Sequence, residues 1–472
     1  MDHLQKQGGN IKKIIFVEKT KAMQDSQMLL EVVRLILPEE FLTYFKITKV
    51  TKVKDVITIF MDEFDSLPAD RKGHKVESKG FLDPITIQDF PVRFKKVTLK
   101  VRRRKWYDST TKEYLTNKYD LLAKGTHYSK EFAAFLKKNY LETYPVSARS
   151  LEPICHINGD SLERHYKEHL SSYKNWQMKD HAIEWLLFPE NISPRLCIDE
   201  TSMTNGDLYT ILSNPNNKGK QGTIVAIIAG VQSEKIIQVL MKMPESLRQQ
   251  VKEITLDMAN SMNKIARVCF PKACRVIDRF HLQKLANEAV QEVRVKHRWE
   301  AIEEENQAIK QAKWEGKTYK PLTFSNGDTK KQLLARGRYL LFKSADKWSD
   351  KQKERAKILF AQYPSLKEAY SLSQGLRSIF NRKTIKDAAR LSLAKWYNRV
   401  EQTAFQSFKS IAGTIYSHYD EILNFFNNRS TNAFAESFNA KLKAFRTQLR
   451  GVTDISFFLF RVTKLLLNKL SP

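Results

Sequence analysis

The chain has 472 residues, about three times the usual ~150-residue domain, so two or three domains are expected and a single small binding module is excluded. With 42% apolar and 11% aromatic residues it does not have the composition of a disordered protein. Its 80 Lys and Arg against 52 Asp and Glu give a net charge of +28. This charge predicts a polyanionic partner, and nucleic acid is the leading candidate.

An anionic membrane is the other target of a basic surface. The longest apolar run, Ile224 to Val231, is far below the ~20 residues that span a bilayer and instead predicts a buried strand. The amino-terminal residues lack the layout of a secretion signal, so we expect the protein to stay in the cell. The four cysteines are too few and too irregular for a disulfide framework and are expected to be buried thiols: Cys155, Cys197, Cys269 and Cys274.

Residues 1–128 are predicted to form an α+β region that ends in a basic strand. Between Pro91 and Tyr107 there are eight Lys or Arg and no acid. This pattern favours contact with nucleic acid, although a sheet edge protected by charge would look similar. The predicted DNA contacts are Arg102, Arg103, Arg104 and Lys105.

Residues 129–190 show helical periodicity with a turn at Asn158-Gly159-Asp160, which predicts a helix-turn-helix. Its small core would contain Ile154, Ile157, Leu162 and Tyr166, and Asp160 or Ser161 would cap the second helix. The outer side of that helix would then carry Glu163, Arg164, Lys167 and Glu168, with Arg164 and Lys167 as DNA contacts. An ordinary helical hairpin remains the alternative.

From Arg195 the chain reads as three strands (RLCIDE, DLYTILS and GTIVAIIAG), a helix, the strand VKEITLD, a helix, the strand CRVIDRF and another helix. Short links favour antiparallel pairing of the first three strands, and intervening helices favour parallel pairing of the last two. This order is that of a ribonuclease-H-like mixed sheet. We assign residues 191–281 and 429–472 to this domain and 282–428 to a helical insertion. The chain has no GxxxxGK[ST] or GxGxxG loop, which argues against nucleotide hydrolysis.

Three acids far apart in the sequence are predicted to meet. Asp199 and Asp257 end two predicted strands that would lie next to each other in the centre of the sheet. Glu436 lies on a later helix, on the side opposite to the apolar face of that helix. Such carboxylates can hold two Mg²⁺ or Mn²⁺ ions for phosphodiester cleavage. Each acid alone is more often a turn or cap residue. Glu436 shares its side of the helix with Asn432, Asn439 and Lys443, opposite an apolar face of Phe434, Phe438, Leu442 and Phe445.

The segments LCIDET, ITLDMANSMNKIARVCFPKACRVIDRFHLQKLANEAVQEVR and TNAFAESFNAKLKAFR resemble the DDE-domain transposases of bacterial insertion sequences, in particular the IS-L3 group. The resemblance spans about Arg195 to Leu467. It implies Asp199, Asp257 and Glu436 as the metal-binding triad, and the family's E-G-x-N sequence here reads Glu436-Ser437-Phe438-Asn439. No cysteine precedes Tyr140, so the zinc knuckle of many relatives is not expected.

The DRFH sequence implies site-adjacent roles for Asp278, Arg279 and His281, and Asn439 is expected beside them. Asp278 could bind metal, or it could simply cap a helix in which Phe280 is packed. Arg279 is expected to hold a phosphate or pair with a carboxylate. Lys441 and Lys443 are further predicted DNA contacts.

We therefore expect a DNA transposase that cleaves insertion-sequence ends and joins the 3′-hydroxyl to target DNA by two-metal phosphoryl transfer. Its expected partners are double-stranded DNA, as terminal inverted repeats and target, and a second copy of the chain. The expected location is the bacterial cytoplasm, at the nucleoid. The alternatives are a non-enzymatic DNA-binding protein, either a regulator or an inactive relic, and a nuclease that cuts without joining.

Overall fold

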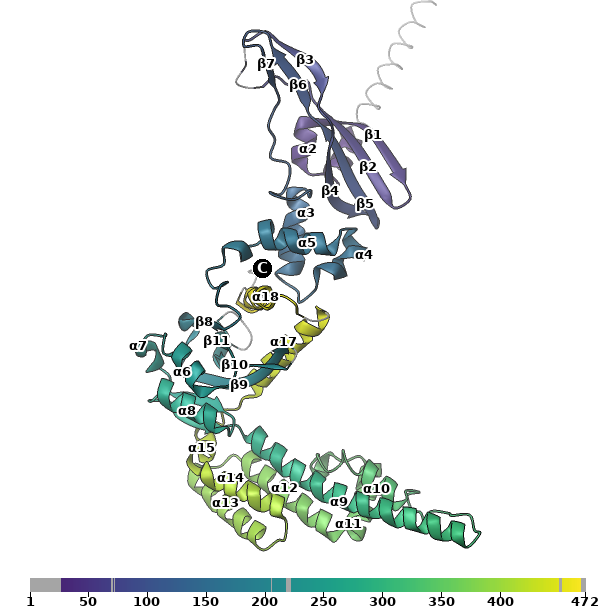
Figure 1. Ribbon diagram of the computed structural model, residues 1–472, viewed down its shortest axis with the longest axis vertical. Coiled ribbons are helices and arrows are strands. Elements are labelled where there is room, and N and C mark those ends of the chain that lie inside the picture. Colours follow the sequence, from purple (N-terminus) through teal and green to yellow (C-terminus); the bar gives the residue numbers. More distant parts are fainter. Residues whose placement is uncertain are drawn as a thin grey trace, which may run out of the picture. The chain divides into compact units, whose positions relative to one another are not determined.

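The structure is a computed structural model that describes residues 27–68, 71, 73–204, 206–217, 222–449 and 452–467 (Figure 1). The chain divides into two compact units, and each is described by itself. Unit 1 comprises residues 1–180, 447–465 and 470–472, and unit 2 comprises residues 181–446 and 466–469. Among the described residues, no helix is both long and apolar enough to cross a bilayer.

Unit 1 begins with a four-stranded sheet in the order β1-β2-β5-β4, where β2 and β5 are parallel and the outer pairs antiparallel. Its apolar residues alternate along β2 and β5 and bury side chains such as Met61 and Leu99 beneath α2. The basic run predicted as a strand forms β5 and β6, and β6 belongs to a second sheet, β3-β6-β7. The bounds are α2 Glu39–Tyr44, β1 Phe45–Val53, β2 Val56–Glu63, β3 Val76–Phe81, β4 Ile85–Val92, β5 Lys95–Arg102, β6 Arg104–Asp108 and β7 Glu113–Leu115.

The helical part of unit 1 has one buried core that includes Ile157, Leu162 and Tyr166, as predicted. The prediction was wrong for Ile154, which is 50% exposed because α4 is a single turn that points it outward. The cap of α5 is Asn158, whose side chain accepts from the Ser161 N–H, and not Asp160 or Ser161. The bounds are α3 Lys130–Phe135, α4 Glu152–Cys155, α5 Gly159–His165 and α18 Ile455–Leu467, with π-helices at Leu136–Leu141 and Tyr166–Leu170 and 3₁₀ turns at Ala148–Leu151 and Tyr173–Asn175.

Unit 2 contains a six-stranded mixed sheet in the order β13-β12-β9-β10-β11-β8. β9, β10 and β11 pair antiparallel, whereas β12 and β13 are parallel to each other and β12 is parallel to β9. Both predicted pairing directions are confirmed, and Ile224 lies in a buried strand, as expected. The bounds are β8 Trp185–Leu187, β9 Arg195–Thr204, β10 Asp207–Ser213, β11 Ile224–Ala229, β12 Glu253–Leu256 and β13 Cys274–Ile277.

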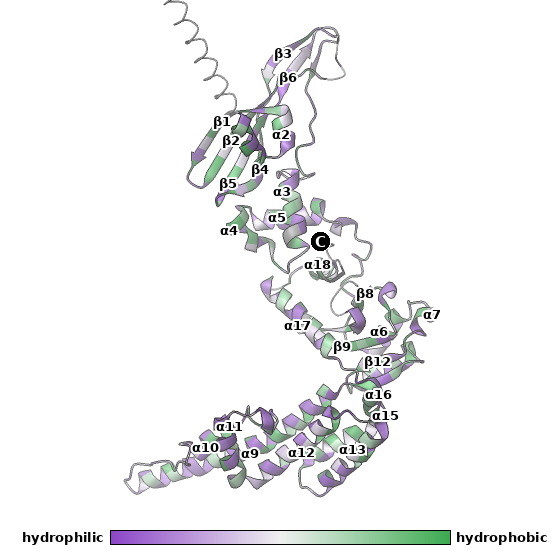
Figure 2. Cartoon of the chain, turned by 180° about the vertical axis from the view of Figure 1, so that it is seen from behind, coloured by the Kyte–Doolittle hydropathy of each residue, from purple (hydrophilic) through white to green (hydrophobic). Residues whose placement is uncertain are grey.

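Helices α6, α7 and α8 connect the later strands, and the apolar sides of α6 and α8 close the core of this sheet. A bundle of helices follows β13 and forms a second large core (Figure 1). Its helices carry hydrophilic and hydrophobic bands side by side, as amphipathic helices do (Figure 2). The bounds are α6 Ser233–Leu240, α7 Glu245–Arg248, α8 Asn260–Cys269, α9 Arg279–Trp314, α10 Lys330–Arg336, α11 Asp350–Gln362, α12 Pro364–Asn381, α13 Lys386–Glu401, α14 Gln406–Ser417, α15 Tyr419–Leu423, α16 Phe425–Asn428 and α17 Ala433–Gln448, with 3₁₀ turns at Pro189–Asn191, Pro215–Asn217 and Ala345–Lys347.

The mixed α/β class is thus confirmed. The helical character predicted for residues 282–428 is also present, although α9 already begins at Arg279, directly after β13. The domain boundaries stay a prediction.

Candidate active site

Three acids lie at one edge of the unit 2 sheet. Asp199 is in β9, and Asp257 and Asp278 directly follow β12 and β13. β12 runs parallel between β9 and β13, in register with both. Continuing that register two residues beyond the last β9–β12 pair brings Asp257 level with Asp199, and one residue beyond the last β12–β13 pair brings it level with Asp278. The strand order therefore gathers two carboxylates just after β12 and β13 beside a third within β9. The prediction that Asp199 ends its strand was wrong, because β9 continues to Thr204 through its pairing with β10.

The carboxylate of Asp199 is hydrogen-bonded on both oxygens, and its pKa is shifted by its surroundings. Its Oδ2 accepts from Nδ2 of Asn439 at 2.8 Å, and its Oδ1 accepts from the backbone N–H of Glu200 at 2.9 Å. Burial raises the pKa of Asp199 to about 6, and the negative charges of Asp257 and Glu436 act in the same direction. The predicted triad is thus close enough to interact electrostatically, and a bound cation would relieve this repulsion.

A second arrangement links the edge of the sheet to α17. One ligand atom from each of Asp278, His281 and Glu436 lies within 4.8 Å of the other two. Asp278 is fully buried, its Oδ1 caps α9 by accepting from the Phe280 N–H at 3.2 Å, and its Oδ2 has no hydrogen-bond partner. Asp278 therefore caps the helix with one oxygen and also contributes a carboxylate to the cluster, so capping and metal binding are compatible roles for it.

Helix α17 is held against the sheet by asparagines. Asn432, which is fully buried, donates from Nδ2 to the carbonyl of Ile198 at 3.3 Å, while Asn439 binds Asp199. Phe438 is buried on the opposite side of the helix, and Glu436 lies exposed in the first turn. Leu442 and Phe445 are also buried, as predicted for the apolar face. The polar side of α17 therefore faces the acids of the sheet.

The donor set suits a hard divalent cation. Carboxylate oxygens are the ligands that Mg²⁺ and Mn²⁺ prefer, and a buried oxygen without a partner is costly unless an ion or proton satisfies it. Asp199, Asp257, Asp278 and Glu436 could supply these oxygens, with His281 as a nitrogen donor at the same place.

Glu200 is a further acid at the site that sequence reasoning missed. Burial raises its pKa, and the nearby charges of Asp257 and Asp199 add to the effect. The sequence offered one sign of this role, the position of Glu200 next to Asp199. Because side chains alternate along a strand, Glu200 would be expected on the opposite face of the sheet from Asp199.

Arg279 and Glu421 have partners away from these acids. Arg279 donates from Nη1 to Oδ1 of Asn381 at 2.9 Å, and its expected contact with a phosphate or carboxylate stays a prediction. Glu421, which precedes Glu436 by fifteen residues, forms a 3.1 Å salt bridge with Arg275. The structure thus brings Glu436 to the cluster and gives Glu421 a structural partner.

The predicted DNA contacts differ in how far their charges are already engaged. In unit 1, Arg102 forms a bidentate pair with Asp62, Arg104 lies over the rings of Phe81 and Trp106, and Lys105 lies over Tyr114. Lys167 pairs with Glu163 at 2.9 Å and Asp454 at 3.0 Å. Arg103 is half-buried, whereas Arg164, Lys441 and Lys443 are exposed. All of these DNA contacts stay predictions.

A family model described as a transposase matches residues 196–462, which is more than half of the chain and includes every acid of this site. The protein is therefore a transposase. Within that class the matching model is that of the IS-L3 group, and the chain belongs to this family, as the sequence segments suggested. A comparison with curated proteins finds no match.

Proposed function

We propose that this transposase cleaves DNA at the ends of its insertion sequence and joins the freed 3′-hydroxyl to target DNA, using divalent metal ions at the acid edge of a ribonuclease-H-like sheet. The observation that carries the proposal is the convergence of Asp199, Asp257 and Asp278 with Glu436 and His281, which lie in or directly after β9, β12, β13, α9 and α17. A regulator that only binds DNA has no need of such a cluster.

Two successive displacements at phosphorus account for the reaction. Water attacks the phosphorus at the element end, the P–O3′ bond breaks, and the 3′-oxygen leaves with a proton. That 3′-hydroxyl then attacks a target phosphorus and forms a new P–O3′ bond, while the target's own P–O3′ bond breaks and its 3′-oxygen leaves with the proton that the attacking hydroxyl gives up. Divalent ions held by the carboxylates would lower the pKa of the attacking oxygen and stabilise the charge on the leaving one.

The side chains of the chain prepare this centre. Asn439 fixes the orientation of the Asp199 carboxylate, and Asn432 anchors the start of the helix that bears Glu436. Asp278 caps α9 and so fixes its first turn, which carries His281.

The decisive experiment measures cleavage and strand transfer on terminal-repeat DNA with Mg²⁺. We expect Asp199→Asn, Asp257→Asn and Glu436→Gln to reduce both activities to the level seen without metal, while Glu401→Gln, at an exposed site in α13, retains both. Wild-type rates in the three site variants would refute the proposal. Cleavage without joined products would instead identify a nuclease.

Unit 1 is proposed as the part that recognises element ends, through the basic strand and the α5 region. Two ends must be brought together for insertion, so we also propose that two copies of the chain act in the DNA complex.

A further inference from the structure

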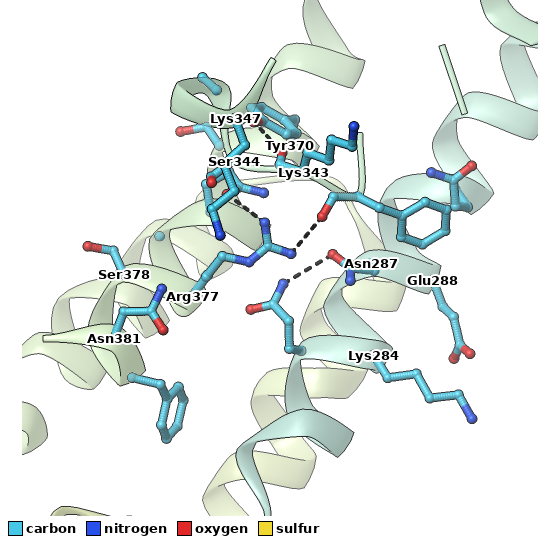
Figure 3. Close-up of a pocket in the computed structure, with 18 of the residues that line it drawn as sticks. Lys284, Asn287, Glu288, Lys343, Ser344, Lys347, Tyr370, Arg377, Ser378 and Asn381 are labelled. Atoms are coloured by element: carbon cyan, nitrogen blue, oxygen red, sulfur yellow. Dashed lines mark hydrogen bonds between the residues drawn. The ribbon is translucent and has the colours of Figure 1, made fainter. Parts of the chain in front are cut away.

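A large groove lies in the helical insertion of unit 2, with a volume of about 1970 Å³. Its walls are α9, α12 and the connecting segment 338–348 (Figure 3). The groove begins at Arg279 and Phe280, in the first turn of α9. It therefore starts within one helical turn of Asp278 and His281.

The charge of the groove is strongly positive. Ten Lys or Arg line it, against two acids, Glu288 and Asp346. Elsewhere in the insertion, Arg336 and Arg355 are neutralised by the buried Asp328. Among the residues that the structure describes, none of the ten groove cations forms a salt bridge with a carboxylate. Unneutralised cations in a concave surface concentrate an anion there.

Two arginines in the groove are fixed by neutral partners. Arg294, 6% exposed, donates to the carbonyl of Leu334 at 3.0 Å, and burial lowers its pKa. Arg377 donates to the carbonyl of Phe342 at 2.9 Å and to Oε1 of Gln374 at 3.0 Å, and burial lowers its pKa as well. Figure 3 shows Arg377 between the segment that carries Lys343 and the helix that carries Asn287. Both guanidinium groups are held by neutral acceptors and form no salt bridge, although the charge of Asp346 in the same groove acts on Arg377.

Gln374 adds a donor to the same wall. Its Oε1 is occupied by Arg377, while its Nε2 is buried and has no hydrogen-bond partner. A buried donor left unpaired is costly, and a phosphate oxygen or base carbonyl would satisfy it. The groove thus combines cations that form no salt bridge with a buried hydrogen-bond donor that has no partner.

Exposed aromatic rings distinguish this groove from a purely electrostatic surface. Phe280 is 44% exposed and Phe342 is 36% exposed. The packed Phe280 of the alternative interpretation of the DRFH sequence is not observed, because this side chain lines the groove. Unpaired bases stack on such rings, whereas the base faces of a duplex are covered by neighbouring base pairs. Positive charge combined with exposed rings favours a single strand.

We propose that this groove binds a single strand of DNA that extends from the acid edge of the sheet along α9, with Phe280 stacking on a base near the cut. The inference rests on the proposed function, because it assumes that the acid edge acts on DNA. Lys343, Lys347 and Lys367 would contact its phosphates, as lysines of single-strand binding sites do.

The first test measures binding of a labelled single-stranded oligonucleotide to the full chain by fluorescence anisotropy, without divalent metal. We expect the triple variant Lys343→Ala, Lys347→Ala, Lys367→Ala to lose affinity about tenfold or more, and its log–log salt slope to fall by about two, at ~0.7 per phosphate contact. The control triple Lys310→Ala, Lys313→Ala, Lys395→Ala removes the same charge from exposed sites outside the groove. An equal loss in both triples, or a loss confined to duplex DNA, overturns the proposal.

The second test concerns stacking. Phe280→Ala should weaken single-strand binding about fivefold or more with an unchanged salt slope, and Phe280→Trp should restore it. Trp314→Ala, at an 83% exposed ring at the far end of the same helix, should have no effect. An oligonucleotide carrying 5-iodouracil should cross-link to Phe280 in the wild type. Cross-links elsewhere, with unchanged affinity of Phe280→Ala, would refute the groove.

These outcomes are separable from failure of the proposed function. Asp199→Asn, Asp257→Asn and Glu436→Gln should bind the single strand like the wild type while losing cleavage. If those variants cleave normally, the metal-dependent mechanism is wrong, whatever the groove variants do. If they fail to cleave but the groove variants bind normally, only the groove is wrong.

Discussion

Two basic regions of this protein differ in what their charges already contact. In the basic run formed by β5 and β6 of unit 1, Arg102 is paired with Asp62, and Arg104 and Lys105 lie over aromatic rings. In the groove of unit 2, ten cations have no carboxylate partner among the described residues. A run of Arg and Lys in a sequence therefore does not by itself mark a free anion site. What matters is whether the fold supplies counter-charges.

The same contrast holds for the buried acids. Glu63 is fully buried, and its oxygens accept from the Arg104 N–H, Asn117 and Tyr119. Asp278 is as deeply buried, yet one of its oxygens has no partner. Satisfied buried groups stabilise a fold, whereas unsatisfied ones point to a ligand.

The largest change in the free energy of unfolding is expected at Asp328, a buried carboxylate that is paired with two arginines. Asp328 is fully buried between Arg336 and Arg355, so Asp328→Asn should lower the free energy of unfolding by about 3 kcal/mol. Denaturant unfolding measures this loss, with Asp350→Asn, at a 99% exposed carboxylate, as the control. Single-strand affinity of the folded variant should be unchanged. If Asp328→Asn has the same free energy of unfolding as the wild type, the paired charges of the insertion would not differ from the groove cations in their contribution to stability.

Asp278, which has an oxygen without a hydrogen-bond partner, should contribute to stability only when Mg²⁺ is bound. Saturating Mg²⁺, at a hundredfold excess over its Kd, should stabilise the wild type by about 2.7 kcal/mol in thermal unfolding. Asp278→Asn should lose most of this gain while keeping the helix cap, and without Mg²⁺ it should be at least as stable as the wild type. Asp387→Asn, at an exposed residue of α13, is the control. Full Mg²⁺ stabilisation of Asp278→Asn would remove that residue from the site.

A smaller effect is expected at the paired cation of the basic strand. Asp62→Asn disrupts the bidentate contact with Arg102 and should cost about 1 kcal/mol, because that guanidinium is 45% exposed. Duplex affinity should not fall, since a positive charge is released and none is lost. Titration with labelled duplex, beside urea unfolding, measures both quantities, and weaker binding would show that the pair itself positions DNA.

The smallest change in stability is expected for Arg103, whose side chain forms no ion pair within the described residues. Arg103→Ala should change stability by no more than about 0.5 kcal/mol. If the strand contacts duplex DNA, the salt slope should fall by about 0.9, the value for one phosphate. The exposed Lys118 supplies a matched control. An equal drop in Lys118→Ala would mean that the strand has no special role.

The sequence predicted the unit 2 sheet well because its strands are short apolar runs separated by clear turns and helices. The same patterning placed Asp199 and Asp257 on neighbouring strands and Glu436 on the polar side of a helix. The groove could not be predicted, because its residues are scattered over more than a hundred positions and converge only when α9 packs on α12. Ile154 was misassigned for a related reason, since helical period alone does not say which apolar side chain a short turn exposes.

Helix α9 is one unbroken element from Arg279 to Trp314, which at 1.5 Å per residue makes a rod about 54 Å long. Its capped end belongs to the acid cluster, and its next turns form a wall of the groove. If the groove binds its strand as proposed, a displacement of this wall would be carried by the same helix to the turn that bears His281. Loading of the groove would then be mechanically linked to the geometry of the acid cluster.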